Sequence, residues 1–163
     1  IGQESAQVPA VNSYKQSPER YFQLTFRVLD TSAEGRVTNS RSYSEMFTTG
    51  PKSEFTGSIR TGDRVAVATG AGSLQFQYID IGTKIDANRA EVVDRMLRLH
   101  VTADISSMST TAPGSPEKPV IRHTSWDSNV IVPIGKPTLI LSADNSADRG
   151  KTELELTAVP IGQ

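Results

Sequence analysis

The chain contains two histidines, His100 and His123, whose side chains are suited to moving protons near neutral pH. Asp104 and Asp127 lie near them in the sequence, so a histidine–carboxylate pair in a hydrolase is one hypothesis. No Gly-x-Ser-x-Gly, phosphate-binding loop or His-Glu-x-x-His motif accompanies the histidines. We therefore expect both to be ordinary residues of a polar face, and we predict no catalytic residues and no enzyme activity.

The segment Asp144-Asn145-Ser146-Ala147-Asp148-Arg149-Gly150 begins like a calcium loop, because oxygen-bearing side chains alternate before a glycine. The glycine comes one position late, however, and Arg149 adds a positive charge. Glu155 stands at the twelfth position, but on an expected strand. Asp, Asn, Ser and Gly are also typical of hairpin loops. We therefore predict a hairpin loop here, with no metal site and no cofactor.

Acidic side chains could also form a carboxylate pair for glycoside chemistry. The candidates are Asp30, Glu34, Asp80 and Asp86. Acidic residues are common at strand ends and turns, and the sequence does not fix the separation of these four. We predict no glycosidase site from them.

Aromatic residues suggest a binding surface instead. Trp126, the only tryptophan, lies between polar neighbours in His-Thr-Ser-Trp-Asp-Ser-Asn. An exposed tryptophan there would suit a binding hot spot, whereas one lying flat over a sheet edge would be structural. With Tyr78 it could serve a small-ligand or carbohydrate-binding module. Arg41 and Tyr43 are further candidates for partner contact.

The composition excludes several classes of protein. The chain has 163 residues and a net charge of −1, from 17 basic and 18 acidic residues. Nucleic-acid binding needs a clustered basic face, which the sequence lacks. There is no apolar run near the roughly 18 residues of a membrane-spanning helix. The absence of cysteine excludes disulfides, thiolate catalysis and cysteine-ligated zinc.

We expect one domain over residues 20–163, preceded by a flexible arm at residues 1–19. The arm is polar and lacks hydrophobic periodicity. The chain begins at Ile1, which suits either removal of a signal peptide or a boundary chosen within a longer sequence. We favour export, so the expected location is periplasmic or otherwise exported.

The N-terminal half predicts antiparallel strands. Residues 21–29 alternate apolar and polar, and residues 37–48 form a second strand after a turn at Gly35. Alternation in residues 37–48 is poor, because Asn39, Arg41 and Glu45 share parity with Val37, Tyr43 and Phe47. That mixture is typical of an edge strand or a bulge. Thr61-Gly62-Asp63 predicts a tight hairpin between strands at 57–60 and 64–68.

The remaining residues continue the pattern. The sequence predicts a central strand at 74–86 with a kink at Gly82, and a turn or single helical turn at 87–96. Alternation is cleanest at 97–105, and a long loop is expected at 106–119. Further strands are expected at 120–132, 137–142 and 151–159. The predicted fold is all-β: an antiparallel β-sandwich or partly closed barrel of roughly nine strands.

Residues 80–160 resemble the C-terminal β domain of bacterial secretins, the outer-membrane ring proteins of secretion and pilus systems. The resemblance rests on Ile81-Gly82-Thr83-Lys84-Ile85-Asp86, on Ile105-Ser106-Ser107, on Pro119-Val120-Ile121-Arg122 and on Ile134-Gly135-Lys136-Pro137. The chain departs from the family at Ser142-Ala143-Asp144, where secretins commonly carry two glycines. The whole chain also resembles small exported bacterial proteins of unassigned function. The resemblance implies a shared topology.

These observations predict a noncatalytic, exported envelope protein that acts through protein–protein contacts, with another envelope protein or with itself. The edge at residues 37–48 is the expected contact surface, because strand addition uses main-chain groups. The alternative is the small-ligand or carbohydrate-binding module. Neither nucleic-acid binding nor a membrane-spanning segment is expected.

Overall fold

The computed structural model describes residues 19–50, 56–68, 75–109, 120–146 and 149–162. The predicted flexible arm at 1–19, except Glu19, lies outside the described residues, as does most of the predicted loop at 106–119. Every regular element among the described residues is a β-strand. In this part of the chain there is consequently no helix that could cross a lipid bilayer.

The described residues form eight strands, which confirms the all-β prediction. They are β1 (Arg20–Thr31), β2 (Val37–Thr49), β3 (Gly57–Ala68), β4 (Phe76–Val93), β5 (Met96–Ser109), β6 (Val120–Pro133), β7 (Thr138–Asp144) and β8 (Lys151–Ile161).

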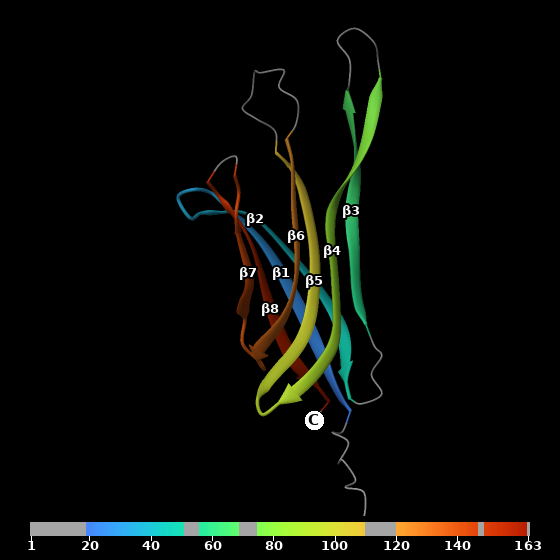
Figure 1. The fold of residues 1–163 in the computed structure, drawn as a ribbon, viewed down its shortest axis with the longest axis vertical. Helices are drawn as coiled ribbons and strands as arrows, with labels where there is room; N and C mark the ends of the chain where they lie inside the picture. Colours follow the sequence, from blue (N-terminus) through green and yellow to red (C-terminus); the bar gives the residue numbers. More distant parts are fainter. Residues whose placement is uncertain (1–18, 51–55, 69–74, 110–119, 147–148, 163) are drawn as a thin grey trace, which may run out of the picture.

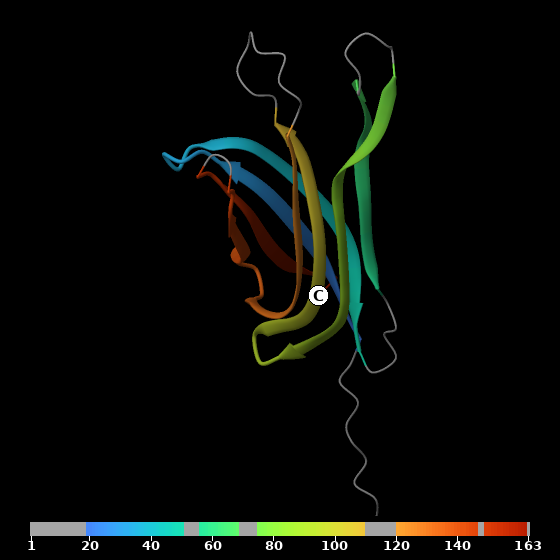
Figure 2. The same ribbon diagram turned by 45° about the horizontal axis from the view of Figure 1, so that its top comes forward.

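The strands form two four-stranded antiparallel sheets that face each other (Figures 1 and 2). The first sheet has the order β2-β1-β8-β7, and the second has the order β3-β4-β5-β6. The second sheet is a simple meander, whereas the first combines strands from both ends of the chain. Strand β2 lies at an edge of its sheet, as its irregular pattern predicts.

Alternate side chains of the two sheets fill the space between them. Strand β1 contributes the fully buried Phe22, Leu24, Phe26 and Val28, whose intervening residues face outward or lie near the surface. The same alternation places five side chains of β5 and three of β8 in the core: Leu97, Leu99, Val101, Ala103, Ile105, Leu154, Leu156 and Ala158. Because successive side chains point to opposite faces of a strand, one face of each strand is buried in the core and the other is not.

The predicted hairpin at Thr61-Gly62-Asp63 is wrong. Strand β3 runs through these residues, and they pair with Thr83, Gly82 and Ile81 of β4. This continuity accounts for eight strands where the turn signals suggest nine. A Gly-containing triplet favours a turn only if no neighbouring strand holds it extended, and β4 does so here.

Of the turn or single helical turn expected at residues 87–96, the structure has only a two-residue turn at Asp94 and Arg95, which joins β4 to β5. Strand β4 continues to Val93 and contains one extra residue between Asn88 and Glu91, opposite His100 and Arg98 of β5. Such a β-bulge accommodates the helix-favouring residues, and Arg89 adopts a positive φ of 52° there. Ten residues form at best a marginal helix, so pairing with β5 prevails.

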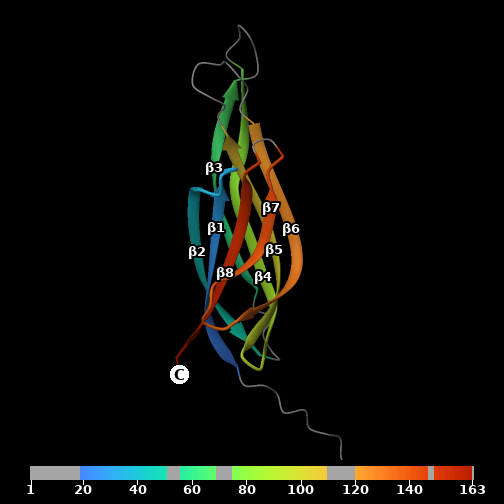
Figure 3. The same ribbon diagram turned by 90° about the vertical axis from the view of Figure 1, so that its left-hand side faces the viewer.

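The outer ends of β3 and β4 project beyond the rest of the sandwich (Figures 1 and 3). Pairing between β4 and β5 ends at Thr83, opposite Ile105, whereas β4 continues to pair with β3 as far as Phe76. Residues 62–68 and 76–82 therefore form a two-stranded extension of the sheet. We call this extension the arm; it is separate from the flexible N-terminal arm predicted at residues 1–19. Among its described residues, no backbone pairing with a third strand occurs, and only the side chain of Ser106 on β5 reaches the arm, at Gly82.

Two facing glycines mark the base of the arm. Gly62 pairs with Gly82, and Gly82 has a φ of 156°, which side-chain-bearing residues rarely adopt. A Cβ atom at Gly82 would collide with the carbonyl oxygen of Thr61, and one at Gly62 would collide with that of Ile81. The expected kink at Gly82 coincides with the point where β4 leaves β5, but β4 stays in its own sheet.

This crowding predicts the effect of a methyl group. We expect Gly82→Ala to lower the free energy of unfolding by roughly 3 kcal/mol or more, because backbone strain alone costs about 1–3 kcal/mol and the methyl group also displaces β3. Gly135→Ala is the matched control, since Gly135 has a φ of 81° but nothing within 4 Å of an added Cβ. Its cost should be about 1–2 kcal/mol. Equal losses in urea denaturation would contradict the steric explanation.

Candidate functional site

The outer face of the second sheet carries most of the polar side chains singled out in the sequence. Because the core takes alternate residues of β5, the others point away from the core, and the same applies to β3, β4 and β6. We call this surface the polar face. Its charged and imidazole groups include Arg60, Arg64, Asp80, Lys84, Asp86, His100, Asp104, His123 and Asp127.

Both histidines of the polar face lie beside a carboxylate on the neighbouring strand. Nε2 of His100 is 3.3 Å from Oδ2 of Asp127, which also accepts a 2.8 Å hydrogen bond from Thr102. Nε2 of His123 is 3.8 Å from Oδ1 of Asp104. The structure thus brings together both histidine–aspartate pairs considered in the sequence. Among the described residues, neither histidine hydrogen-bonds a hydroxyl group that could act as a nucleophile.

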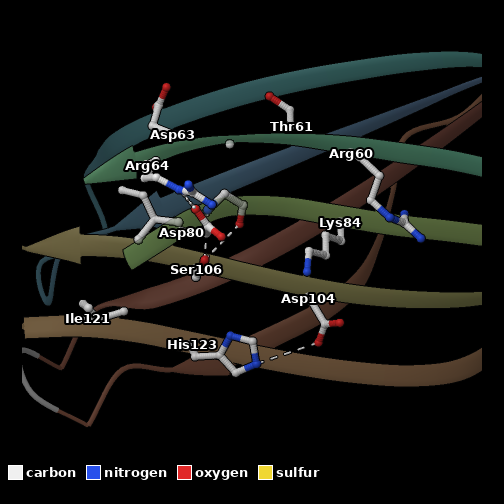
Figure 4. Close-up of a pocket in the computed structure, with 13 residues that line it drawn as sticks. Arg60, Thr61, Asp63, Arg64, Asp80, Lys84, Asp104, Ser106, Ile121 and His123 are labelled. Atoms are coloured by element: carbon white, nitrogen blue, oxygen red, sulfur yellow. Dashed lines mark hydrogen bonds and ion pairs between the residues drawn. The ribbon is translucent and has the colours of Figure 1, made fainter. Parts of the chain in front are cut away.

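A pocket of about 720 Å³ opens on the polar face beside the base of the arm (Figure 4). It lies where β4 and β5 separate, and Ser106 partly bridges that gap. The backbone N–H of Gly82 donates a 2.9 Å hydrogen bond to Oγ of Ser106, which in turn donates to the Gly82 carbonyl at 3.4 Å. The pocket therefore forms because β4 moves away from β5 at this point.

Charges in and around the pocket are largely neutralised. Arg64 donates a 2.9 Å hydrogen bond to Asp80 and holds the pKa of that carboxyl below its usual range. Both side chains are more than two-thirds exposed, so the pair adds little stability. Arg60 binds both oxygens of Asp86 at 2.8 Å. The side chain of Lys84 forms no hydrogen bond or ion pair with any described residue, and it extends from β4 toward β5 (Figure 4).

The pocket can therefore offer positively charged donors and negatively charged acceptors of hydrogen bonds to a polar ligand. Metal binding has no support in the described ranges, since no three His, Asp or Glu side chains gather closely enough to hold an ion. Asp144 and Gly150 flank the connection from β7 to β8, and N–H of Asn145 donates to the Gly150 carbonyl at 2.8 Å. That geometry confirms the predicted hairpin, although residues 147–148 lie outside the described part.

The carboxylates proposed for glycoside chemistry each bind a separate donor. Asp30 accepts from Arg41, Asp80 from Arg64 and Asp86 from Arg60. Ser32 donates a 2.7 Å hydrogen bond to Glu34 and lowers the pKa of its carboxyl. The described contacts join no two of these carboxylates.

Arg41 and Tyr43, the candidate contacts of the β2 edge, turn toward the other sheet. Tyr43 packs against the core, and its hydroxyl donates a 3.2 Å hydrogen bond to the buried Thr83 of β4. Arg41 forms a 3.2 Å ion pair with Asp30, and both side chains are mostly buried. A partner could therefore reach the main chain of β2 more readily than these two side chains.

The structure does not bring Trp126 and Tyr78 together. Trp126 packs against the core and pairs with Ala103, which itself lies opposite Ile85 of β4. Tyr78 is 65% exposed on the arm. Seven residues of extended strand, about 23 Å, separate the levels of Ile85 and Tyr78 along β4. A single aromatic binding site using both residues has no support from this arrangement.

Glu45 is a feature that the sequence analysis did not single out as a site. Its side chain points from β2 into the space between the sheets, against Gly57 of β3, where a Cβ would collide with the carboxylate. Burial raises the pKa of the Glu45 carboxyl, the nearby Asp86 raises it further, and the backbone N–H of Ser58 partly opposes this. Among the described residues, no donor forms a hydrogen bond with Oε1 of Glu45. In the sequence, Glu45 has the same parity as Tyr43 and Phe47. That parity was the signal that its side chain would point toward the core.

No family model and no curated protein sequence matches the chain. Solved structures do. The chain is similar to the InvG secretin domain β-barrel of the Salmonella SPI-1 injectisome, with a TM-score of 0.53 and 8% sequence identity over 90% of this chain and 64% of that one. A cryo-EM structure of the same Salmonella secretin gives a TM-score of 0.51 and 9% identity, over 90% of this chain and 66% of that one.

A third similar structure is InvG in a model of the Salmonella SPI-1 basal body proteins InvG, PrgH and PrgK. Its TM-score is 0.51 at 9% identity, and the match covers 90% of this chain but 47% of that one. The chain thus spans less than two thirds of the InvG chains that it matches. The chain has a secretin-like fold, and the similarity extends beyond the residues 80–160 that suggested it.

The environment of Glu45 predicts a pH-dependent stability. A raised pKa means that the folded state binds the proton more tightly than the unfolded state, so stability falls as pH rises from the ordinary glutamate range near 4.3. We therefore expect Glu45→Gln to raise the free energy of unfolding at pH 7 and to have less effect at pH 4. Glu91→Gln, on a side chain 63% exposed, is the control. A Glu45→Gln benefit that is the same at both pH values would refute this assignment.

Proposed function

We propose that this protein is a noncatalytic, exported component of the cell envelope that acts through protein–protein contacts. The observation that carries the proposal is the secretin-like fold, found in proteins described as components of the Salmonella SPI-1 type III secretion injectisome. One of these is described together with two other basal body proteins, PrgH and PrgK. By analogy, the partner of this chain is another envelope protein or a second copy of itself.

Strand edges are the surfaces through which such contacts would form, because an edge presents unpaired main-chain groups. The two sheets have four edges: β2, β7, β3 and β6. Strand β7 has only 7 residues, and its pairing with β8 shifts between Leu139 and Leu141. Strand β3 carries Arg60, Asp63 and Arg64, and charges on an edge discourage pairing with another chain.

The β2 edge, expected from the sequence to be the contact surface, has a protective feature of its own. Arg41 and Glu45 point inward from it, and inward charges are a known means of keeping an edge unpaired. An added strand would have to leave these side chains in a still drier environment. The β2 main chain is therefore a weaker candidate than its position suggests.

Strand β6 carries Arg122 and Asp127, but its half from Ser128 to Pro133 has no charged residue. Its 14 residues pair with β5 without any register shift, and proline occurs only at its end, Pro133. Apolar side chains also remain in water on it: Ile121 is 37% exposed and Ile131 is 53% exposed. A long, regular edge with exposed apolar side chains is suited to pairing with a strand from another protein. We assign the contact to β6.

The assignment predicts the effect of a charge on this edge. Ile131→Lys should reduce crosslinked recovery of the partner from native envelope extract, or reduce self-association if the partner is a second copy, because a lysine opposes strand addition. We expect a loss of roughly tenfold, as for one interface hot spot. The measurement is quantitative mass spectrometry of the pull-down, with size-exclusion chromatography and light scattering for self-association.

Val159→Lys is the matched control, because Val159 is 45% exposed but lies on β8, inside its sheet. It should leave recovery unchanged. Equal loss in both variants would point to a general effect of charge. A monomer that recovers no envelope protein would defeat the proposed function itself.

A further inference from the structure

The second sheet divides into two branches above Thr83 and Ile105, the last residues that pair β4 with β5. Beyond that level the described residues of β4 pair only with β3, and those of β5 pair only with β6. The two branches move apart in space (Figures 1 and 2). We call the region between residues 78–82 of β4 and residues 106–109 of β5 the split.

The pocket on the polar face opens at the base of the split. Asp80 and Gly82 line it from one branch, and Ser106 and Ile121 line it from the other. Its volume of about 720 Å³ shows that the side chains of the two branches do not fill the space between them there. The split is therefore accessible at its base.

The hydrogen bonds of Ser106 show which main-chain groups of β4 point into the split. Both the N–H and the carbonyl of Gly82 are hydrogen-bonded to Oγ of Ser106, so both point toward β5. Successive residues of a strand direct their main-chain groups to opposite sides, and β4 pairs with β3 without a register shift here. The main-chain groups of Asp80 and Tyr78 therefore also point into the split, whereas those of the residues between them bond to β3.

Strand β5 presents a matching row of main-chain groups. If β4 and β5 stayed together, Ser106 would lie opposite Gly82, and the two residues would exchange main-chain hydrogen bonds. Because Ser106 uses its side chain instead, its own N–H and C=O point into the split, as do those of Met108 two residues on. Among the described residues, no main-chain group of the other branch pairs with them. Unpaired donors and acceptors thus face the split from both sides.

We propose that the split binds an extended peptide segment of a partner protein, which becomes an added strand between β4 and β5. An extended main chain carries N–H and C=O groups on both of its sides at strand spacing, so it can pair with both rows at once. A segment added to an outer edge such as β6 would pair with one row only. The inference rests on the divergence of β4 from β5 and is independent of the function proposed above.

The two faces of the split indicate which side chains the segment would carry. On the inner face its neighbours on β4 are Ile79 and Ile81, both half-buried, which favours apolar side chains. On the polar face it would lie beside Asp80 and near His123, which favours polar side chains. The carboxylate of Asp80 is already hydrogen-bonded to Arg64 of β3. The segment would therefore alternate apolar and polar residues.

The branches also set the length of the segment. Residues 78–82 of β4 extend over about 13 Å, which corresponds to a segment of about five residues. Residues 106–109 of β5 carry no charge, and Asp80 is the single charged residue of β4 in this stretch. Few of the charges that oppose strand addition are therefore present.

The test is binding of the full chain to the peptide Thr-Val-Thr-Val-Thr, amidated at its C-terminus and labelled with fluorescein at its N-terminus, measured by fluorescence anisotropy. Two further peptides carry an N-methyl group on the third or on the fourth residue, whose N–H groups point to opposite sides of an extended chain. Each N-methyl group should weaken binding roughly tenfold or more, because both sides are paired in the split. At an outer edge only one of the two would weaken binding.

A pair of proline variants tests the position of the site. Tyr78→Pro removes an N–H that points into the split, and it should weaken binding of the unmethylated peptide roughly tenfold. Ala66→Pro is the matched control, because Ala66 pairs with Tyr78 and directs its N–H to the outer edge of β3. It should bind as the wild type does. Tyr78→Ala separates loss of the ring from loss of the N–H, and equal thermal unfolding of the two proline variants checks their folding.

Amide hydrogen exchange of the wild type requires no variant. The amide hydrogens of Tyr78, Asp80 and Met108 should exchange quickly in the free protein, because they lack partners among the described residues. Saturation with the peptide to about 90% should slow them roughly tenfold. The amide hydrogens of Arg64 and Ala66, on the outer edge of β3, should be unaffected.

Several outcomes would overturn the inference: no binding of the peptide by the wild type up to about 1 mM, weakening by only one of the two N-methyl groups, or equal losses in Tyr78→Pro and Ala66→Pro. Protection of the same amide hydrogens at high protein concentration without peptide would assign the split to a second copy instead. Ile131→Lys should bind the peptide as the wild type does. Its behaviour separates this inference from the contact proposed at β6.

Discussion

Burial of alternate side chains between the two sheets is the constraint on which the rest of the structure depends. Phe26 of β1, Leu99 of β5 and Leu156 of β8 all lie in this core. Their burial fixes, for every other residue of those strands, whether its side chain points into the core or away from it. The residues between the buried ones form the polar face of the second sheet. His100 and His123 reach Asp127 and Asp104 because the core has already fixed the register of β5 and β6.

The features outside the core arise where that constraint ends. Strand β4 separates from β5 at Thr83, and the pocket, the paired glycines and the arm all lie at or beyond this point. The close contact of Gly82 with Thr61 lies at this same divergence, and Lys84 lines the pocket beside it. Two surfaces are thus distinct in origin: β6 is the regular edge of the sheet, and the arm is its unsupported extension.

The sequence predicted the strands whose alternation is complete, such as β1 and β5, because their pattern reflects burial directly. It failed at Thr61-Gly62-Asp63, which pair with β4, and it made the turn at residues 87–96 too long, because pairing with β5 extends β4 to Val93. Glu45 shows what a pattern within one strand cannot reveal. Its parity places its side chain between the sheets, but the space for the carboxylate exists only because Gly57, on a different strand, has no side chain. The pocket joins four strands, so no local pattern could have revealed it.

The strand order of the first sheet also determines when the chain can complete its fold during synthesis. Strand β1 pairs with β8 across more than a hundred residues, from Tyr21 opposite Ile161 to Thr31 opposite Lys151. The meander of β3 to β6 forms through contacts between consecutive strands, but the core between the sheets lacks Leu154, Leu156 and Ala158 until β8 is synthesised. Formation of such distant contacts is slow. The nascent chain therefore leaves part of its core exposed until β8 can pair with β1, and a chaperone would be needed most in that interval.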